Sequence, residues 1–451
     1  MGATSACGAA LMVLGAAGCS GSSSNTTHEP GDGGYGALDA GGMDRAEVGV
    51  RTVDAMAAPD VPYPAQFPTP PQVANSMGGV LKNPKIVAIF FPNDDPATVT
   101  NYEKFYADLG ASAWWQALSE YGIGAPTVMD VMLTTAAPAT IDDTSNSSGS
   151  NTALETWLLS EITSGALPAT SADTEYVINY PASTTVTEAG TLCADGTGGY
   201  HADMTDNSNN LIAYAVVPRC PAAQGFTVDQ NFTTSASHEV IEAATDPWPD
   251  YQPGWAQADN AHLFWDEANS GSEIGDMCEN DPEAYYQFSD LPFMVQRFWS
   301  NAAAKAGHDP CVPALPGETF FAAVPELPTT DSFPYYGNTV QTDAIKIPVG
   351  QSAMVTVDLY SDKPTAGWTV QVYDWLTFFN GEPPSSALLT IDPPSASGNN
   401  GDRIPFKITV TSAGNENTNG EITDTELFVV QVQQGSGSNA TQHFWFGLVG
   451  Q

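Results

Sequence analysis

The residues best suited to chemistry lie in the run HEVIEAATDP, positions 238–247. His238, Glu242 and Asp246 are spaced four residues apart, so a helix would carry all three side chains on one face. An apolar stripe follows the helical period on the opposite face: Phe232, Ala236, Val240, Ala243 and Ala244. A helix that lines up an imidazole and two carboxylates is suited to holding a divalent cation.

His238 and Glu239 also form half of the HExxH signature of zinc proteases, in which two histidines bind the metal and the glutamate activates water. Here Glu242 stands in place of the second histidine. In a catalytic interpretation Glu239 is the general base. The simpler alternative is that the polar stripe is the solvated face of a surface helix.

An acidic segment at 262–281, predicted to be a loop, contributes Glu273 and Asp276 just downstream of this helix. Crowded carboxylates repel one another unless a cation or buried hydrogen bonds offset the charge. We therefore predict that His238, Glu242 and Asp246 converge with Glu273 or Asp276 in one metal-binding pocket. Oxygen ligands suit calcium, whereas a histidine with carboxylates suits zinc, and the spacing does not choose between them.

The region 76–315 alternates strand and helix patterns. We expect strands at 85–91, 127–133, 175–180 and 211–217, and helices at 98–121 and 151–164. The helix that bears His238 is expected to begin at a capping box formed by Thr227 and Gln230 and to stop at Pro247. This order matches the catalytic half of zincins, so we predict an α/β class with a zincin-like α+β central domain.

Seven segments of this region occur in the same order in a known family: IVAIFF, ASAWWQAL, LCADGTGGYH, AYAVVPRC, SHEVIEAATDP, EIGDMC, and MVQRFW with the following Cys311. On these segments, 76–315 resembles the phosphate-induced/EXORDIUM family of plant cell walls and bacterial secreted proteins. The resemblance implies an extracellular or wall-associated protein without an established catalytic activity. The family also carries a histidine at the position of His201, which is either a further ligand or substrate contact, or a structural hydrogen-bonding residue in a glycine-rich loop.

The region 316–451 contains seven short runs with partial alternation, separated by turn residues. They are IKIPV, AMVTVDLY, WTVQVYDW, ALLTI, IPFKITVT, ELFVVQV and HFWFGLV. Their number and spacing predict a separate all-β, immunoglobulin-like sandwich.

The N-terminal part predicts export. Residues 1–18 read as a signal peptide that ends in a lipobox, with Cys19 as the lipidated residue; a plain secretory signal is the alternative. Residues 19–75 are rich in Gly, Ser, Asp and Pro and predict a flexible tether. In an oxidising compartment we expect two disulfides, Cys193–Cys220 and Cys278–Cys311, each closing a loop of about 30 residues.

The charge limits the partners. The chain has 12 Lys and Arg against 52 Asp and Glu, a formal net charge of −40, which argues against a nucleic-acid partner. We expect a cell-envelope or extracellular protein, attached to a membrane by its N-terminal lipid or secreted, with an envelope polymer or protein as partner. Two functions fit: a non-catalytic lipoprotein that binds a divalent cation, or a secreted zincin-like hydrolase that uses Glu239.

Overall fold

The computed structural model describes residues 53–54, 64–144, 151–188, 190–194, 196–223, 225–269, 271–335, 338–365, 367–379, 386–413, 425–435 and 440–451. The predicted signal segment 1–18 and Cys19 lie outside the described residues. In the part of the chain that is described, no helix has the length and apolar character needed to cross a bilayer.

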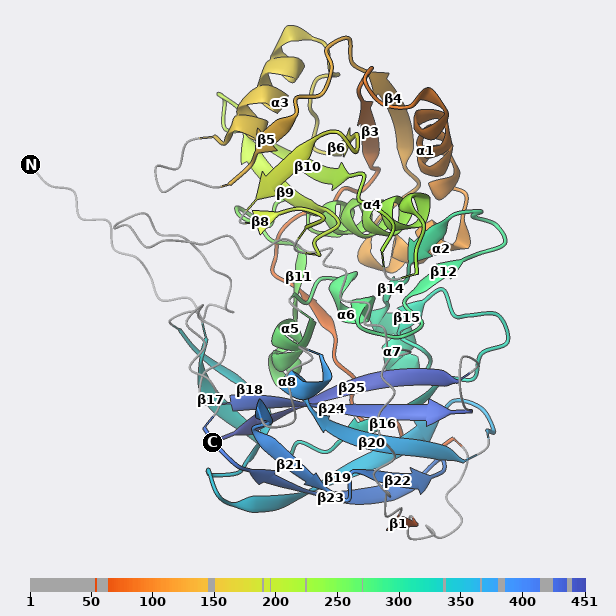
Figure 1. Ribbon diagram of the computed structural model, residues 1–451, viewed down its shortest axis with the longest axis vertical. Coiled ribbons are helices and arrows are strands. Elements are labelled where there is room, and N and C mark those ends of the chain that lie inside the picture. The colour runs from red at the N-terminus through yellow and green to blue at the C-terminus, as the bar shows by residue number, and fades with distance from the viewer. Residues whose placement is uncertain are drawn as a thin grey trace, which may run out of the picture.

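A five-stranded sheet organises the first half of the molecule (Figure 1), in the order β4-β3-β6-β10-β9. Its strands are β3 (Lys85–Phe90), β4 (Thr127–Met132), β6 (Thr174–Tyr180), β9 (Tyr200–Thr205) and β10 (Leu211–Pro218). The first four strands in the order are parallel, and β9 runs antiparallel to β10 at the edge. The four parallel strands were predicted. We missed β9, because glycines precede it and His201 and Asp203 interrupt its apolar residues, although they do so with the period of two that a strand requires.

Helices cover both faces of this sheet (Figure 1). Apolar residues of α3 (Ala153–Ser164) pack on one face, and those of α1 (Pro96–Leu109) and α4 (Val228–Thr245) pack on the other. The helix predicted at 98–121 is three elements: α1 ends at Leu109, and α2 (Ala113–Gln116) and η1 (Ala117–Tyr121) follow. The break arises because the Ser112 side chain accepts a hydrogen bond from the Trp115 amide and starts a new helix.

Helix α4 begins at the predicted capping box of Thr227 and Gln230. Every residue of this helix from position 231 to position 245 is buried. Its apolar stripe packs on the sheet, and its polar stripe is covered by β9, by β13 (Met294–Gln296) and by the turn around Gly275. The interpretation of that stripe as a solvated face is therefore wrong, because the downstream chain folds back over it.

The connection after α4 is well structured. It contains β11 (Trp255–Ala258), η2 (Asn260–His262), α5 (Phe264–Asn269), α6 (Asp276–Glu279), β12 (Tyr285–Gln287), β13, β14 (Phe298–Trp299), α7 (Asn301–Ala306) and β15 (Cys311–Val312). The segment 262–281, predicted to be a loop, thus contains the two short helices α5 and α6 in full. The first half also contains a separate three-stranded sheet in the order β5 (Thr140–Asp142), β7 (Thr185–Glu188) and β8 (Gly190–Thr191). The predicted disulfides Cys193–Cys220 and Cys278–Cys311 are both present.

The second half is built of strands in two sheets. One sheet has the order β16-β19-β23-β21, with β16 (Phe321–Pro325), β19 (Ser352–Ser361), β21 (Leu389–Asp392) and β23 (Arg403–Val410). The other contains β17 (Thr329–Tyr335), β18 (Asn338–Lys346), β20 (Trp368–Asp374), β22 (Ser395–Gly398), β24 (Thr425–Gln434) and β25 (Thr441–Gly450), with β1 (Val53–Asp54) at its edge. Helix α8 (Trp375–Phe378) follows β20. Strands form at all seven predicted runs, and the rings of Phe321 and Trp368 stack between the sheets.

The two halves share one apolar core. Trp265 of α5 packs edge-on against Trp445 and Phe446 of β25. Two segments of the range 19–75, predicted to be a tether, also join this body. In the stretch 64–75, Phe67 packs against Trp445 and Val73 of β2 (Val73–Asn75) is buried, and β1 pairs with β22. Apolar side chains within a proline-rich segment explain its ordering here, because they gain by leaving water.

Candidate metal centre

A buried triad joins α4 to the turn that precedes α6. His238 and Glu242 lie one helical turn apart, with Nε2 of the histidine 2.8 Å from Oε2 of the glutamate. The same Nε2 lies 3.4 Å from Oδ1 of Asp276. The three side chains are at most 1 % exposed. We refer to His238, Glu242 and Asp276 as the His238 triad; their donor atoms lie within 4.8 Å of one another.

Hydrogen bonds orient this triad. The Gly275 and Asp276 amides both donate to Oε1 of Glu242, at 2.9 and 3.2 Å. Gln296 donates from Nε2 to the Gly275 carbonyl at 2.8 Å, so its Oε1 faces Nδ1 of His238, 3.0 Å away. That arrangement makes Nδ1 the donor and leaves Nε2 facing Glu242 and Asp276. With a cation bound, the imidazole would be neutral and Nε2 would offer its lone pair to the metal.

A second group lies beside the first. His201, Asp246 and Glu273 also bring one donor atom each within 4.8 Å of one another, and we refer to them as the His201 triad. Strand β9 directs His201 toward α4, because Tyr200 and Ala202 pack on the other face of the sheet. Nε2 of His201 lies 3.7 Å from Oε2 of Glu273. Asp246 is the C-cap of α4 rather than part of it, and its Oδ1 accepts a hydrogen bond from the Gly254 amide.

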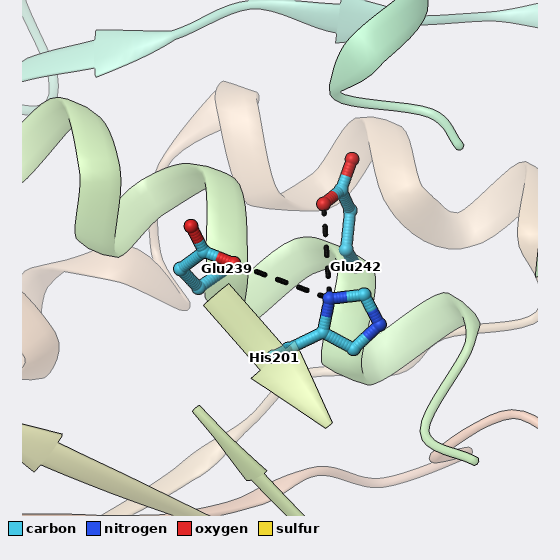
Figure 2. Close-up of side chains that lie close together, drawn as sticks. All are labelled: His201, Glu239 and Glu242. Atoms are coloured by element: carbon cyan, nitrogen blue, oxygen red, sulfur yellow. Dashed lines mark ion pairs between the residues drawn. The ribbon is translucent and has the colours of Figure 1, made fainter. Parts of the chain in front are cut away.

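Glu239 and Glu242 connect the two triads. Figure 2 shows Nδ1 of His201 between these carboxylates, 4.0 Å from Oε2 of Glu239 and 3.9 Å from Oε2 of Glu242. Close packing of the main chain fixes this region. A Cβ atom at Gly199 would lie 2.9 Å from Oε1 of Glu239, and one at Gly275 would lie 2.5 Å from Oε1 of Glu242.

Several buried donor atoms of the two triads have no hydrogen-bond partner beyond the ion-pair contacts among the triad residues themselves. They are His238 Nε2, Glu242 Oε2, Asp276 Oδ1, Asp246 Oδ2 and both ring nitrogens of His201. A buried polar atom without a partner costs about 1–3 kcal/mol, and more when it is charged. These atoms are of the types that bind metals, and they face one another. A cation between them would therefore give each of them a ligand bond.

The pKa values reflect the crowding of carboxylates. Burial and the neighbouring Asp276 raise the pKa of Glu242 to about 7. Burial is also the main reason why the pKa of Asp246 is raised to about 6. Burial works against the charged form of His238, but the Glu242 and Asp276 carboxylates outweigh it and hold the pKa of that imidazole well above its usual value. Burial and the adjacent His238 lower the pKa of His201 to about 3.

The structure brings together all the residues that we predicted as ligands: His238, Glu242, Asp246, Glu273 and Asp276. It divides them between two triads, and it places His201 beside them. The glycine-rich loop that we expected around His201 is strand β9 at this residue. The role of His201 as a ligand stays a prediction. The sequence reasoning missed Gln296 and Gly275. The signal for Gln296 was a pair of polar residues, Gln296 and Arg297, inside the otherwise apolar run MVQRFW at 294–299.

Comparisons with known proteins add little to this site. No family model matches the chain. No curated protein matches it either. Among solved structures, the periplasmic chaperone SfaE is similar to part of the chain, with 18% identity and a TM-score of 0.15. The similarity covers 24% of this chain and 53% of the chaperone, about half of its length.

Proposed function

We propose that the protein binds a divalent cation through His238, Glu242 and Asp276, and that it does so without catalysing a reaction. The observation that carries the proposal is that His238 Nε2, Glu242 Oε2 and Asp276 Oδ1 are buried, converge on one another, and have no hydrogen-bond partner outside the triad. An isolated buried carboxylate is costly, and protein interiors accept one when it is paired or when it coordinates a metal. A cation would supply the partner that each of these atoms needs.

The donor set favours zinc over calcium. Calcium sites use six to eight oxygen ligands, whereas imidazole is a typical ligand of zinc and of other late first-row metals. The hydrogen bond between His238 Nδ1 and Gln296 is the kind of support that metal-binding histidines have in their outer shell. The amides of Gly275 and Asp276 orient Glu242 in the same way.

The burial of the triad favours a structural cation over a catalytic one. Structural zinc sites are closed by protein ligands, whereas catalytic sites keep a position open for water and substrate. The His238 and Glu242 side chains are fully buried, and Asp276 is 1 % exposed. The two disulfides fit an oxidising, extracellular compartment.

This function fits the following wider proposal. The central region is zincin-like in its sheet and helix order and is related to the EXORDIUM family, and the C-terminal region is an immunoglobulin-like sandwich. The chain is attached to the cell envelope through a lipid at Cys19, and its partner is an envelope polymer or protein. Support for the zincin-like assignment comes from the edge strand β9, which runs antiparallel beside the helix that bears His238 and Glu239.

Metal content tests the proposed function. The purified protein, incubated with zinc chloride and desalted, should retain zinc by elemental analysis, and Asp276→Asn should lose one equivalent per chain. The matched control is Asp203→Asn, the same isosteric change at a buried carboxylate of β9 outside both triads. Retention of the wild-type zinc content by Asp276→Asn would refute the ligand assignment.

A second candidate function, a zincin-like hydrolase, is favoured by the position of Glu239. Its Oε2 lies 4.0 Å from Nδ1 of His201, next to Glu242, so it could act on a water bound to the same cation. A loss of the general base reduces a rate by about 10²–10⁴-fold. If a hydrolytic activity is found with peptide substrates, Glu239→Gln should abolish it while the zinc content stays unchanged. A Glu239→Gln protein that keeps its full rate excludes this mechanism.

A further inference from the structure

We propose that the His201 triad binds a second divalent cation, so that the buried cluster is a two-metal centre. This inference rests on the proposed function, because it takes the His238 triad as the site of the first cation. His201, Asp246 and Glu273 contribute one imidazole and two carboxylates, the same donor set as the first site. These two triads share no residue, so both can be occupied at once; a third group, His201 with Glu239 and Glu242, takes one residue from each of them.

Burial and missing hydrogen bonds point to a ligand at the second triad independently of its acidity. Asp246 is fully buried; its Oδ1 is occupied by the Gly254 amide, while its Oδ2 makes no hydrogen bond. His201 is 8 % exposed, and neither of its ring nitrogens makes a hydrogen bond. One donor atom each of His201, Asp246 and Glu273 lies within 4.8 Å of the others, close enough for a single ion to contact all three.

The charge of the cluster also exceeds what one cation offsets. Two triads and the intervening Glu239 place five carboxylates in the interior: Glu239, Glu242, Asp246, Glu273 and Asp276. One divalent cation compensates about two of these charges, and two cations compensate about four. Charges removed from water cost several kcal/mol each unless they are paired. A second cation is therefore the more favourable way to ionise the whole cluster.

The same two segments of the chain, the end of α4 and the turn before α6, supply carboxylates to both triads and so place the triads side by side. Glu242 and Asp246 lie one helical turn apart at the end of α4, and Glu273 and Asp276 lie on one turn, where the Glu273 amide donates to Oδ2 of Asp276 at 3.0 Å. Each segment gives one carboxylate to each triad. The histidine is the part that differs, since His238 comes from α4 and His201 comes from β9.

The number of bound zinc ions tests the proposal. The full chain is loaded with zinc chloride, desalted, and analysed by native mass spectrometry, with folding checked by circular dichroism. We expect two zinc ions in the wild type and in Asp203→Asn, and one in Asp246→Asn. Asparagine keeps the Oδ1 acceptor for the Gly254 amide, so this change preserves the helix cap. Glu273→Gln, which leaves that cap untouched, should also retain one zinc ion, and Asp246→Asn combined with Asp276→Asn should retain none.

The outcomes separate the two proposals. One zinc ion in the wild type and the same number in both Asp246→Asn and Glu273→Gln overturns the second site and leaves the proposed function intact. No zinc in the wild type overturns both. Two zinc ions that persist in Asp276→Asn while Asp246→Asn loses one overturn the His238 triad but support the His201 triad.

Discussion

The molecule contains two buried clusters of ionisable residues, which differ in the source of the positive charge beside their carboxylates. The first, which we call the metal cluster, consists of the two triads and Glu239. The second, the arginine cluster, joins the two halves of the molecule and consists of Arg297, His443, Asp281, Asp309 and Glu318. Arg297 is fully buried; it pairs with Asp309 and donates to the Glu283 and Cys311 carbonyls. His443 lies 3.1 Å from Asp281 and 3.7 Å from Glu318.

The comparison shows two ways to bury carboxylates. In the arginine cluster the positive charges come from the chain itself: Arg297 pairs with Asp309, and His443 with Asp281. Such pairing offsets the cost of burying the charges. In the metal cluster the contacts of the carboxylates include two histidines, and one of these, His201, is held in its neutral form by burial. A protein with 12 Lys and Arg for 52 acids has few cations to place in its interior, and a metal ion from solution is an alternative.

The largest effect is expected at the arginine cluster. Arg297→Met removes the cation but keeps much of the volume, and it leaves Asp309 buried without its charge partner. Breaking a buried pair costs about 3–5 kcal/mol, which denaturant unfolding would measure. Arg403→Met is the control, because Arg403 pairs with Asp358 and Glu326 at the surface, where such pairs contribute about 0–1 kcal/mol. If both variants lose the same stability, the burial of Arg297 does not set the cost.

Removal of metal should have the next largest effect, and only on the metal cluster. A ligand present at 100 to 1,000 times its dissociation constant stabilises the folded state by about 3–4 kcal/mol. A chelator should therefore lower the unfolding temperature of the zinc-loaded protein by several degrees, and added zinc should restore it. Scanning calorimetry measures both steps. In Arg297→Met the decrease caused by the chelator should be as large as in the wild type, because the two clusters have separate counter-ions.

The arginine cluster should also give the protein a specific pH dependence. Burial alone would lower the pKa of His443, but Asp281 and the nearby Asp309 and Glu318 outweigh it and raise the pKa to about 9. The folded-state pKa thus lies above the unfolded value of about 6.5. The protonated His443 therefore adds on the order of 2–3 kcal/mol to the free energy of unfolding. This stabilisation is complete below about pH 6.5 and is lost as the pH rises through about 9.

Unfolding experiments at pH 6 and pH 9.5 measure this contribution. The stability difference between wild type and His443→Gln should be larger at pH 6 than at pH 9.5. The control is His308→Gln: His308 pairs with Asp362 but is exposed, so its substitution should change stability little at either pH. An equal loss in His443→Gln at both pH values would mean that the charge of His443 does not stabilise the fold.

The smallest effect tests how closely the metal cluster is packed. Gly275 has an ordinary helical φ of −74°, so alanine suits its backbone, but the added Cβ would lie 2.5 Å from Glu242 Oε1 and 2.9 Å from His238 Nδ1. Gly275→Ala should weaken zinc binding by about 10–100-fold, as other changes to the support of metal ligands do. Competition with a chromophoric chelator measures the affinity.

Gly110→Ala is the matched control for Gly275→Ala. Its Cβ would lie 2.8 Å from Pro126 Cδ, a similarly close contact far along the chain from the metal ligands. This variant should lose stability but keep the zinc affinity of the wild type. Unchanged affinity in Gly275→Ala would show that the Glu242 carboxylate can move away from its amide partners without losing the metal.

Much of the fold follows from local pattern. The spacing of Phe232, Ala236 and Val240, together with the capping box at Thr227, defines α4 almost to its ends. The parallel strands were recognisable as short apolar runs. Both disulfides follow from the order of the four cysteines, because each pair closes a short loop.

The error in the helix at 98–121 is also local. The side chain of Ser112 competes for the Trp115 amide, and this competition outweighs the apolar periodicity that continues past Leu109.

The sequence by itself determined which side chains share a face of α4, because the helical period fixes the placement of His238 and Glu242 whatever surrounds them. Only the tertiary structure decided that this face is buried, that Asp276 meets Glu242 across 34 positions of sequence, and that His201 reaches the cluster from an edge strand. The division of the acids into two triads was likewise a tertiary result. Backbone geometry sets the relation of residues within one turn, whereas the meeting of distant segments depends on how whole elements pack, which no local spacing records.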